Sequence, residues 1–187
     1  MEIRCVAVIG AGTMGAGIAQ ICAQSGWKTN LFDAFPEGLA RGMQRIDAFW
    51  DKGIARGKTT AEQKVQWAAN LHAVADMADA VGQADLIIEA VPEIPELKHS
   101  IFAELDRLAP PHAILGTNTS SLSIADIAAA TSRPENVIGM HFFNPVPIMK
   151  LLELVRHDST SDATIAAAQA AGTAMGKTTI LVKDIPG

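Results

Sequence analysis

The sequence has no excess of positive charge. Its 187 residues include 15 lysines and arginines against 20 aspartates and glutamates, a net charge of −5 with neutral histidines. Basic residues nowhere form a long uninterrupted block. A protein that binds nucleic acid needs a concentrated positive surface to meet the phosphate backbone. We therefore expect no nucleic-acid partner.

Long apolar runs are also missing. A membrane-spanning helix needs roughly 18 or more consecutive apolar residues, and no stretch of this chain reaches that length. The N-terminus passes almost at once into the apolar run "CVAVIG", with no charged segment and cleavage site before it. Such a start is not typical of a secretory signal peptide. We expect no contact with membranes and a cytoplasmic location.

Cysteine is scarce, because Cys5 and Cys22 are the only two. One falls in an apolar run and the other in a helical pattern, and their spacing is not that of metal ligands. Isolated thiols of this kind suit a reducing compartment and buried positions. The sequence therefore predicts buried, free thiols and no metal site.

What is present is the pattern of an α/β protein. Hydrophobic residues make up 49% and charged residues 19% of the chain, as in globular proteins. Short apolar runs alternate with longer helical patterns, which is typical of β-α units with a mostly parallel sheet. We predict strands near 3–9, 28–32, 85–91, 113–117, 136–141, 150–155 and 179–183. Helices are predicted near 13–25, 36–57, 60–69, 94–108, 123–130 and 161–175.

The segment from about 36 to 70 contains two consecutive helical patterns where a simple crossover needs one. We predict a helical hairpin that protrudes from the sheet, with "ARGKTT" as its turn. This segment contains four acids against six basic residues, namely Arg41, Arg45, Lys52, Arg56, Lys58 and Lys64. This local positive excess could meet a phosphorylated ligand, or it could be an ordinary solvated helix face.

The stretch "VAVIGAGTMGAGIAQ" reads as a strand, a glycine-rich turn and a helix. Gly10 would permit the tight turn, Gly12 would let a pyrophosphate approach the backbone, and Gly15 would let the helix pack closely on the strand. Thr13 and Met14 complete the turn. A helix N-terminus offers free N–H groups to the pyrophosphate. The pattern predicts dinucleotide binding because it follows a strand and opens a helix.

Asp33 ends the next strand, 18 residues after Gly15. A carboxylate there can accept hydrogen bonds from the adenosine ribose hydroxyls and would repel a 2′-phosphate. The next seven residues contain no arginine, so the sequence favours NAD over NADP. Alternatively, Asp33 could serve only as a turn or cap residue before Pro36.

Polar residues follow further strands. Glu89 and Glu93 stand at the end of "DLIIEAVPE", with Lys98 one turn into the next helix, and Asn118 opens a run of four small polar residues that includes Ser120. Ligands of open α/β sheets bind outside the carboxyl ends of the strands. We expect these side chains to line one rim, although helix caps could explain some of the hydroxyls.

His141 ends the strand "NVIGM". A single histidine beside phenylalanines is usually a packed core residue. However, Glu153 lies on a strand face that it shares with Leu151 and Val155, and a buried carboxylate there requires a partner. His141 is the natural partner, because a carboxylate on one ring nitrogen raises the basicity of the other. The two residues together predict a catalytic base.

The segments "GAGTMGAGIA", "NTSSLSI", "HFFNPVPIMKLLELV" and "DIPG" together resemble the 3-hydroxyacyl-CoA dehydrogenase family over essentially the whole chain. The resemblance implies a Rossmann-like, doubly wound, mostly parallel sheet with a protruding helical hairpin. It also implies NAD-dependent oxidation of (S)-3-hydroxyacyl-CoA to 3-oxoacyl-CoA, or the reverse reduction. The resemblance implies that 1–187 is the NAD-binding domain and that a helical domain, through which the protein forms homodimers, normally follows Gly187.

Carried over by position, the resemblance assigns His141 as the catalytic histidine and Glu153 as its orienting acid. Ser120 and Asn144 would contact the reacting part of the acyl-CoA substrate. The expected contacts to NAD are the turn residues Gly10, Gly12, Thr13, Met14 and Gly15, together with Asp33, Glu93, Lys98 and Asn118. Lys52 falls near a CoA-binding lysine of the family, although Asp51 stands where a serine is common.

Three alternatives accompany this interpretation. The chain could be an isolated NAD-binding module with little activity of its own. It could be a structural relative that kept the fold for another purpose, although the intact set of His141, Glu153, Ser120 and Asn144 argues against this. It could also be a related dehydrogenase of a free hydroxy acid, but the better-known members of that group use a lysine base and lack this histidine segment.

Overall fold

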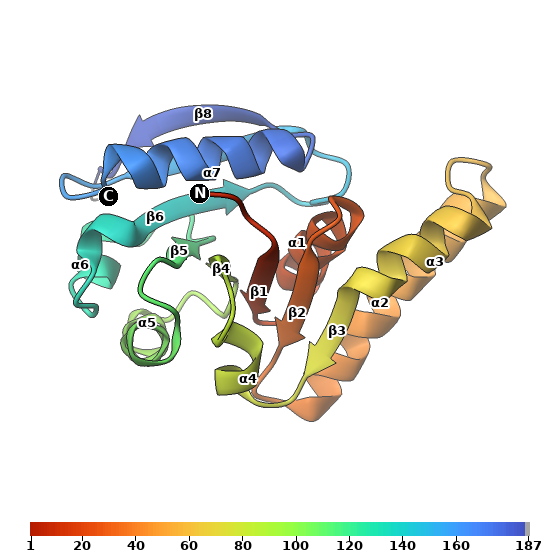
Figure 1. The fold of residues 1–187 in the computed structure, drawn as a ribbon, viewed down its shortest axis with the longest axis horizontal. Coiled ribbons are helices and arrows are strands. Elements are labelled where there is room, and N and C mark those ends of the chain that lie inside the picture. The colour runs from red at the N-terminus through yellow and green to blue at the C-terminus, as the bar shows by residue number, and fades with distance from the viewer. Residues whose placement is uncertain (186–187) are drawn as a thin grey trace.

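Eight strands form a single sheet in the computed structural model, which describes residues 1–185 (Figure 1). Along the sheet the order is β3-β2-β1-β4-β5-β6-β7-β8. The strands are β1 (Cys5–Ile9), β2 (Lys28–Phe32), β3 (Leu71–Val74), β4 (Leu86–Glu89), β5 (Ile114–Thr117), β6 (Val137–Phe142), β7 (Leu151–Arg156) and β8 (Thr178–Lys183). The helices are α1 (Thr13–Gln24), α2 (Pro36–Ala55), α3 (Ala61–Asn70), α4 (Met77–Val81), α5 (Pro95–Leu108), α6 (Ile124–Ala128), the short 3₁₀ helix η1 (Pro134–Asn136) and α7 (Asp162–Ala174).

All neighbouring strands run parallel except β6 and β7, which are antiparallel. The link between these two strands covers only residues 143–150, and a parallel crossover needs about a dozen residues or more. The strand order reverses on either side of β1, as in a doubly wound sheet. The predicted α/β class with a mostly parallel sheet is therefore confirmed.

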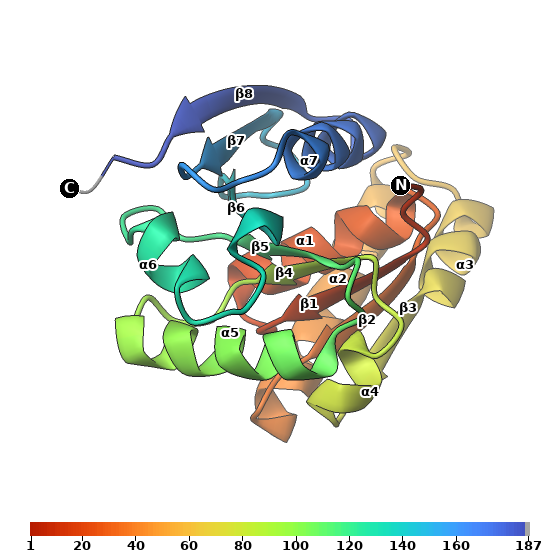
Figure 2. The ribbon, with the colours of Figure 1, turned by 60° about the vertical axis from the view of Figure 1, so that its left-hand side comes forward.

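Helices cover both faces of the sheet (Figure 2). Residues of α1, α2 and α7 join the core cluster on one face, and residues of α4, α5 and α6 join the cluster on the other. The central strands β1 and β4 are buried along their whole length. Burial on both faces is the reason why these strands appear in the sequence as continuous apolar runs.

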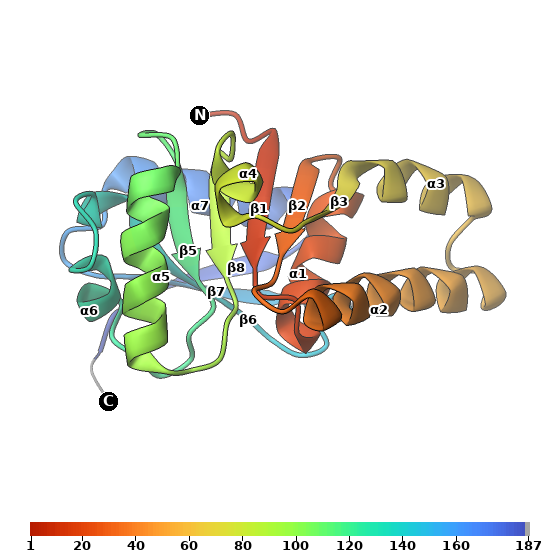
Figure 3. The ribbon, with the colours of Figure 1, turned by 90° about the horizontal axis from the view of Figure 1, so that it is seen from below.

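The predicted helical hairpin is present as α2 and α3, which project together from one end of the sheet (Figure 3). Thr60 caps α3 by accepting a hydrogen bond from the Gln63 N–H, and the Gln63 side chain accepts one from the Thr60 N–H. Trp50 anchors the base of the hairpin, because it is almost fully buried and donates to Gln24. The hairpin is thus held by its base, and its distal turn extends away from the sheet.

The strand β3 and the helix α4 are not predicted by the sequence pattern. β3 is a four-residue edge strand in which only Leu71 is buried, so it lacks the apolar run of the central strands. α4 has five residues, too few to show a helical period. β3 forms because the chain returns from the hairpin along the edge of β2, and Asp76 caps α4 by accepting a hydrogen bond from the Ala78 N–H.

Both cysteines are buried and free, as predicted. Burial raises the pKa of the Cys22 thiol to about 12 and also raises that of Cys5, because a thiolate is poorly solvated in the core. Within residues 1–185 no helix is long and apolar enough to cross a membrane. The same part of the chain holds no group of three or more histidine, cysteine or acidic side chains placed to bind a metal ion.

Asp85 stabilises the start of β1, at the end of the sheet where the parallel strands begin. Its Oδ2 accepts hydrogen bonds from the N–H groups of Arg4 and Cys5, at 2.9 and 3.0 Å, and its Oδ1 lies 2.8 Å from His112 Nε2. Burial by itself would raise the pKa of Asp85, but these hydrogen bonds outweigh it and lower the pKa below its usual value. The folded protein therefore favours the ionised form.

This shift predicts a pH-dependent contribution to stability. Because the folded-state pKa is lowered, the contribution is fully present above the ordinary carboxyl pKa of about 3.9 and is lost as the pH falls through the folded-state value. We expect Asp85→Asn to be about 1 kcal/mol less stable than wild type at pH 7, with a difference that shrinks in acid. Urea unfolding of both proteins across the acid range measures this, and a difference that grows in acid would contradict it.

Candidate functional site

The glycine-rich turn joins β1 to α1 at the point where the strand order reverses. Gly10 has a φ of +105°, and a Cβ atom there would lie 2.7 Å from the Ala90 carbonyl oxygen. A Cβ atom on Gly15 would run into the Gly10 carbonyl, whereas one on Gly12 would meet nothing within 4 Å. Gly10 and Gly15 therefore permit the tight packing of the turn, and Gly12 leaves open space above it.

The N-terminus of α1 faces that open space. The N-cap residue is Gly12, which has no side chain to cap the helix, and the first turn contains no acidic residue. The first N–H groups of a helix have no partner within the helix, and the dipole places positive charge at this end. An anionic group above Gly12 would find both donors and a favourable field.

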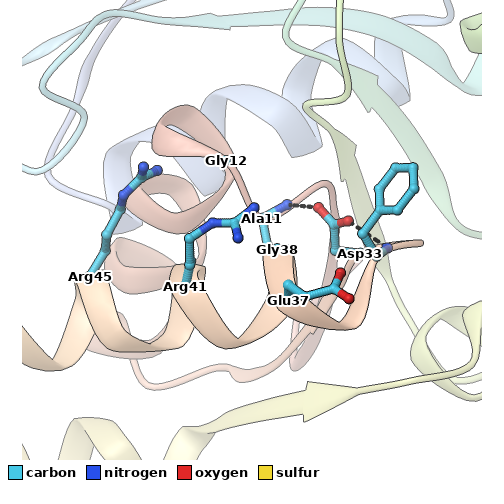
Figure 4. A pocket seen from close by; sticks show the side chains of 8 residues that line it. Ala11, Gly12, Asp33, Glu37, Gly38, Arg41 and Arg45 are labelled. Atoms are coloured by element: carbon cyan, nitrogen blue, oxygen red, sulfur yellow. Dashed lines mark hydrogen bonds between the residues drawn. The ribbon is translucent and has the colours of Figure 1, made fainter.

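Asp33 lies beside the turn at the end of β2 (Figure 4). Its Oδ2 accepts a hydrogen bond from the Ala11 N–H at 2.9 Å, and its Oδ1 accepts one from the Phe35 N–H at 2.8 Å. The hydrogen bond from the Phe35 N–H is the contact expected if Asp33 is a turn residue before Pro36. The hydrogen bond from the Ala11 N–H fixes the carboxylate against the glycine turn. Each oxygen keeps a lone pair for a further donor.

An apolar cavity of about 640 Å³ extends from the turn past Asp33. Its walls come from β1, β2, α4 and α5, and they include Ile9, Phe32, Met77, Leu97 and Ile101. The sequence did not identify Met77 because it lies on the unpredicted helix α4. Leu97 and Ile101 belong to a predicted helix, but only the packing of α5 shows that they reach this cavity.

A second cavity, of about 380 Å³, opens on the other side of the turn. Residues from several segments meet in its lining: Met14, Glu93, Lys98, Asn118, Ser120, His141 and Asn144. All of these are residues that the sequence assigns to the site. The carboxyl ends of parallel strands lie at one edge of a sheet, and this explains why residues distant in sequence are neighbours here.

His141 and Glu153 form a hydrogen-bonded pair, as predicted. They stand opposite each other in the antiparallel register of β6 and β7, and the distance from His141 Nδ1 to Glu153 Oε1 is 2.8 Å. In the tautomer whose Nδ1–H donates this hydrogen bond to the carboxylate oxygen, Nε2 of the neutral imidazole keeps its lone pair. The Phe143 ring packs against the imidazole, with centroids 4.5 Å apart.

The expectation that Glu153 is a buried carboxylate is wrong in degree. The side chain of Glu153 is 30% exposed, and Leu151 and Val155 on the same face are also only partly buried. The core side of β7 is the opposite face, where Leu152 and Leu154 are fully buried. The pair is therefore half-buried. At this depth the hydrogen bond with His141 still stabilises the Glu153 carboxylate.

Asn118 and Glu93 hold the surrounding loops. Asn118 Oδ1 accepts from the Phe142 N–H at 2.9 Å and so ties the end of β5 to β6. The Glu93 carboxylate accepts from Thr119 Oγ1 at 2.5 Å and from the Ser120 N–H at 3.2 Å. Burial would raise the pKa of Glu93, but these hydrogen bonds and the charge of Lys98 lower it overall. Glu93 thus fixes the position of Ser120.

Lys98 lies at the floor of the second cavity and is almost completely buried, with 2% exposure. Its Nζ is 2.8 Å from Glu89 Oε2 and 3.3 Å from Glu93 Oε1. Glu89 is fully buried and also accepts hydrogen bonds from Thr117 and from the Val91 N–H. The ammonium group of Lys98 is therefore held between two carboxylates, and a contact between Lys98 and NAD remains a prediction.

Lys52 is not brought together with the other predicted site residues. It is exposed in the last turn of α2, and the hairpin of α2 and α3 extends away from the sheet (Figure 3). The lining of the second cavity does not include it. Asp184 of the "DIPG" segment accepts hydrogen bonds from Ser123 and the Ala125 N–H, whereas Pro186 and Gly187 lie outside the described residues.

Comparisons with known proteins agree with this geometry. Residues 5–185 match the family model described as "3-hydroxyacyl-CoA dehydrogenase, NAD binding domain". The chain is 43% identical over 187 residues to a probable 3-hydroxybutyryl-CoA dehydrogenase of Bacillus subtilis, covering 100% of this chain and 65% of that protein. It is 46% identical over 155 residues to a 3-hydroxyadipyl-CoA dehydrogenase of Escherichia coli, covering 83% of this chain and 32% of the relative.

The fold matches solved structures equally well. A crystal structure of 3-hydroxybutyryl-CoA dehydrogenase from Escherichia coli superimposes with a TM-score of 0.96 at 41% identity, over 100% of this chain and 39% of that one. The chain thus spans about two thirds or less of the length of these relatives.

Proposed function

The chain belongs to the 3-hydroxyacyl-CoA dehydrogenase family as an NAD-binding domain, and from this premise we propose that the complete enzyme interconverts (S)-3-hydroxyacyl-CoA and 3-oxoacyl-CoA. The observation that carries the proposal is the His141–Glu153 pair, which lines the same cavity as Ser120 and Asn144. A general base, its orienting acid and two polar groups are what the oxidation of a secondary alcohol requires of a protein.

The residues of the turn fit the cofactor. The open space above Gly12 and the uncapped start of α1 suit a diphosphate. The lone pairs of Asp33 suit ribose hydroxyls, and the 640 Å³ apolar cavity beside it suits an aromatic base. When bound, NAD supplies the acceptor for the hydride. Thr13 and Met14 complete the proposed contacts at the turn, and Asn118, Glu93 and Lys98 are proposed at the second cavity.

The roles of the protein groups follow from their contacts. His141 Nε2 takes the proton of the 3-hydroxyl group, because Nδ1 already donates to Glu153. Glu153 then stabilises the imidazolium by its negative charge. Ser120 and Asn144 hold the substrate oxygens, a positioning effect that lowers the entropic part of the barrier. In the reverse direction His141 returns the proton.

A substrate comparison tests the proposal directly. We expect the complete enzyme to consume NADH with acetoacetyl-CoA and to be inactive, or nearly so, with free acetoacetate. The loss of NADH absorbance measures both rates under the same conditions. Equal rates with the two substrates would overturn the acyl-CoA assignment in favour of a dehydrogenase of free hydroxy acids.

We also propose that residues 1–187 act as one domain of a larger enzyme. We propose further that this enzyme is a homodimer in the cytoplasm, and that Lys52 of the hairpin lies near the CoA moiety. The greater length of the relatives supports the first part of this proposal, and the two buried free thiols suit a reducing compartment. Assaying the 187-residue chain beside a longer version with the family's helical domain tests it. Equal activity of the two would show that the additional domain is dispensable.

A further inference from the structure

We propose that Arg41 and Arg45 bind the diphosphate of the dinucleotide cofactor, opposite the N–H groups of the glycine turn. The inference rests on the NAD-dependent function proposed above and adds two ligands to it. In the sequence, both arginines belong to the basic excess of the hairpin, which an ordinary solvated helix face would also explain.

The two arginines are brought over the turn by the packing of α2. They stand four residues apart, and therefore lie on one face of the helix, and both side chains extend toward the glycine turn (Figure 4). Gly42 lies between them in sequence, and a Cβ atom on it would be 2.7 Å from the Ala11 carbonyl oxygen. A Cβ atom on Gly38 would be 3.2 Å from Asp33 Oδ1. These two glycines let the helix rest directly on the phosphate-binding turn.

The charges of Arg41 and Arg45 are not neutralised within the described part of the chain. Neither guanidinium has a carboxylate within 4.0 Å in residues 1–185, although Glu37 precedes Arg41 by one turn and lines the same cavity. Lys64 of the same hairpin is different, because Asp47 and Asp51 hold it at 2.8 and 2.7 Å. Both residues are exposed, and two unneutralised guanidinium groups at a cavity of about 570 Å³ are suited to bind an anionic ligand.

The contact of Arg45 with the turn identifies which part of the ligand it meets. Its Nη1 donates to Thr13 Oγ1 at 2.9 Å, and Thr13 is the first residue of α1. A guanidinium there lies beside the helix N-terminus that binds phosphate in dinucleotide folds. A 2′-phosphate is a poorer match, because Asp33 lines the same cavity and its carboxylate would repel that group.

The diphosphate of coenzyme A carries the same chemistry and is the other possible source. Arg45 also lines a cavity of about 210 Å³ with Phe49 and Asn144, on the side of the proposed substrate. Arg41 lines the cavity that contains Asp33 and Gly12 and does not line the 210 Å³ cavity. Because both arginines share the cavity of the cofactor turn, we assign them to the dinucleotide.

Titrations of Arg41→Met, Arg45→Met and the double variant test the assignment, with NADH fluorescence as the readout and other ligands measured by displacement of NADH. We expect each single variant to bind NADH about fivefold more weakly, as for a partly exposed charge-assisted contact. ADP should lose affinity similarly, and adenosine should lose none. Wild-type affinity should fall with added salt more steeply than that of the double variant. Arg56→Met, at the distal end of α2, is the matched control and should bind like wild type.

The ligand comparison separates the competing explanations. Equal losses for adenosine and ADP would overturn the proposal, because they would indicate a merely structural role. A loss of affinity for coenzyme A or for NADPH with unchanged NADH affinity would also overturn it and would assign the arginines to those ligands. If wild type binds NADH and the variants bind it equally well, this inference alone fails. If wild type does not bind NADH, the proposed cofactor function fails with it.

Discussion

Replacing His141 by alanine is expected to lower the turnover of acetoacetyl-CoA by the complete enzyme by about 10²- to 10⁴-fold, the usual contribution of a general acid or base. The reason is geometric, because Nε2 is the ring nitrogen left free by the 2.8 Å contact between Nδ1 and Glu153. NADH affinity should stay close to that of wild type, since the glycine turn and Asp33 lie on other elements. Steady-state kinetics and NADH titration measure the two quantities separately.

Glu153→Gln and His72→Ala complete this experiment. Glutamine keeps the shape of Glu153 but carries no charge to stabilise the imidazolium, so turnover should fall while NADH affinity stays unchanged. His72 is exposed on the edge strand β3 and away from both cavities, so His72→Ala should be as active as wild type. Turnover of His141→Ala within a few-fold of wild type would exclude His141 as the base.

Replacing Lys98 by methionine is expected to cause a large loss of stability, about 3–5 kcal/mol in the free energy of unfolding. The Lys98 ammonium is the partner of Glu89, a carboxylate with no solvent exposure. Glu89 would keep its hydrogen bonds from Thr117 and the Val91 N–H but would lose its counter-ion. A buried charge without a partner cannot recover its lost hydration. Urea unfolding of the two proteins at neutral pH gives the difference.

A second substitution shows whether charge is the cause. Lys98→Met combined with Glu89→Gln removes the buried negative charge, and the neutral amide needs no counter-ion. We expect the double variant to recover a substantial part of the stability that Lys98→Met loses. A double variant no more stable than the single one would attribute the loss to packing around the lysine stem, and a loss below about 1 kcal/mol would contradict the ion pair's importance.

The sequence predicts the parts of this protein that depend on short-range preferences. The glycine spacing predicts the turn at Gly10–Gly15, and the apolar runs predict the central strands, because burial on both faces leaves no polar alternation. The hairpin follows from two helical periods with a capped second helix. The exceptions are β3 and α4, whose short lengths carry no period.

The candidate site depends on both levels. The alternation along "KLLELV" places Glu153 on an apolar strand face, and from this the sequence predicts His141 as its partner. The antiparallel register of β6 and β7 decides that the two residues stand opposite each other. Which face of β7 enters the core could not be read from the sequence. The burial of Leu152 and Leu154 leaves Glu153 on the half-exposed side.

The sequence by itself determined the class of fold and the glycine-rich turn, because these depend on local backbone geometry and on spacing along the chain, and its resemblance to a known family supplied the predicted site residues. Only the tertiary structure decided that Lys98 lies between Glu89 and Glu93, and that Arg41 and Arg45 share the cavity of Asp33. Electrostatic interactions depend on distance in space. The distances between charges on separate elements are fixed only when helices such as α2 and α5 pack against the sheet.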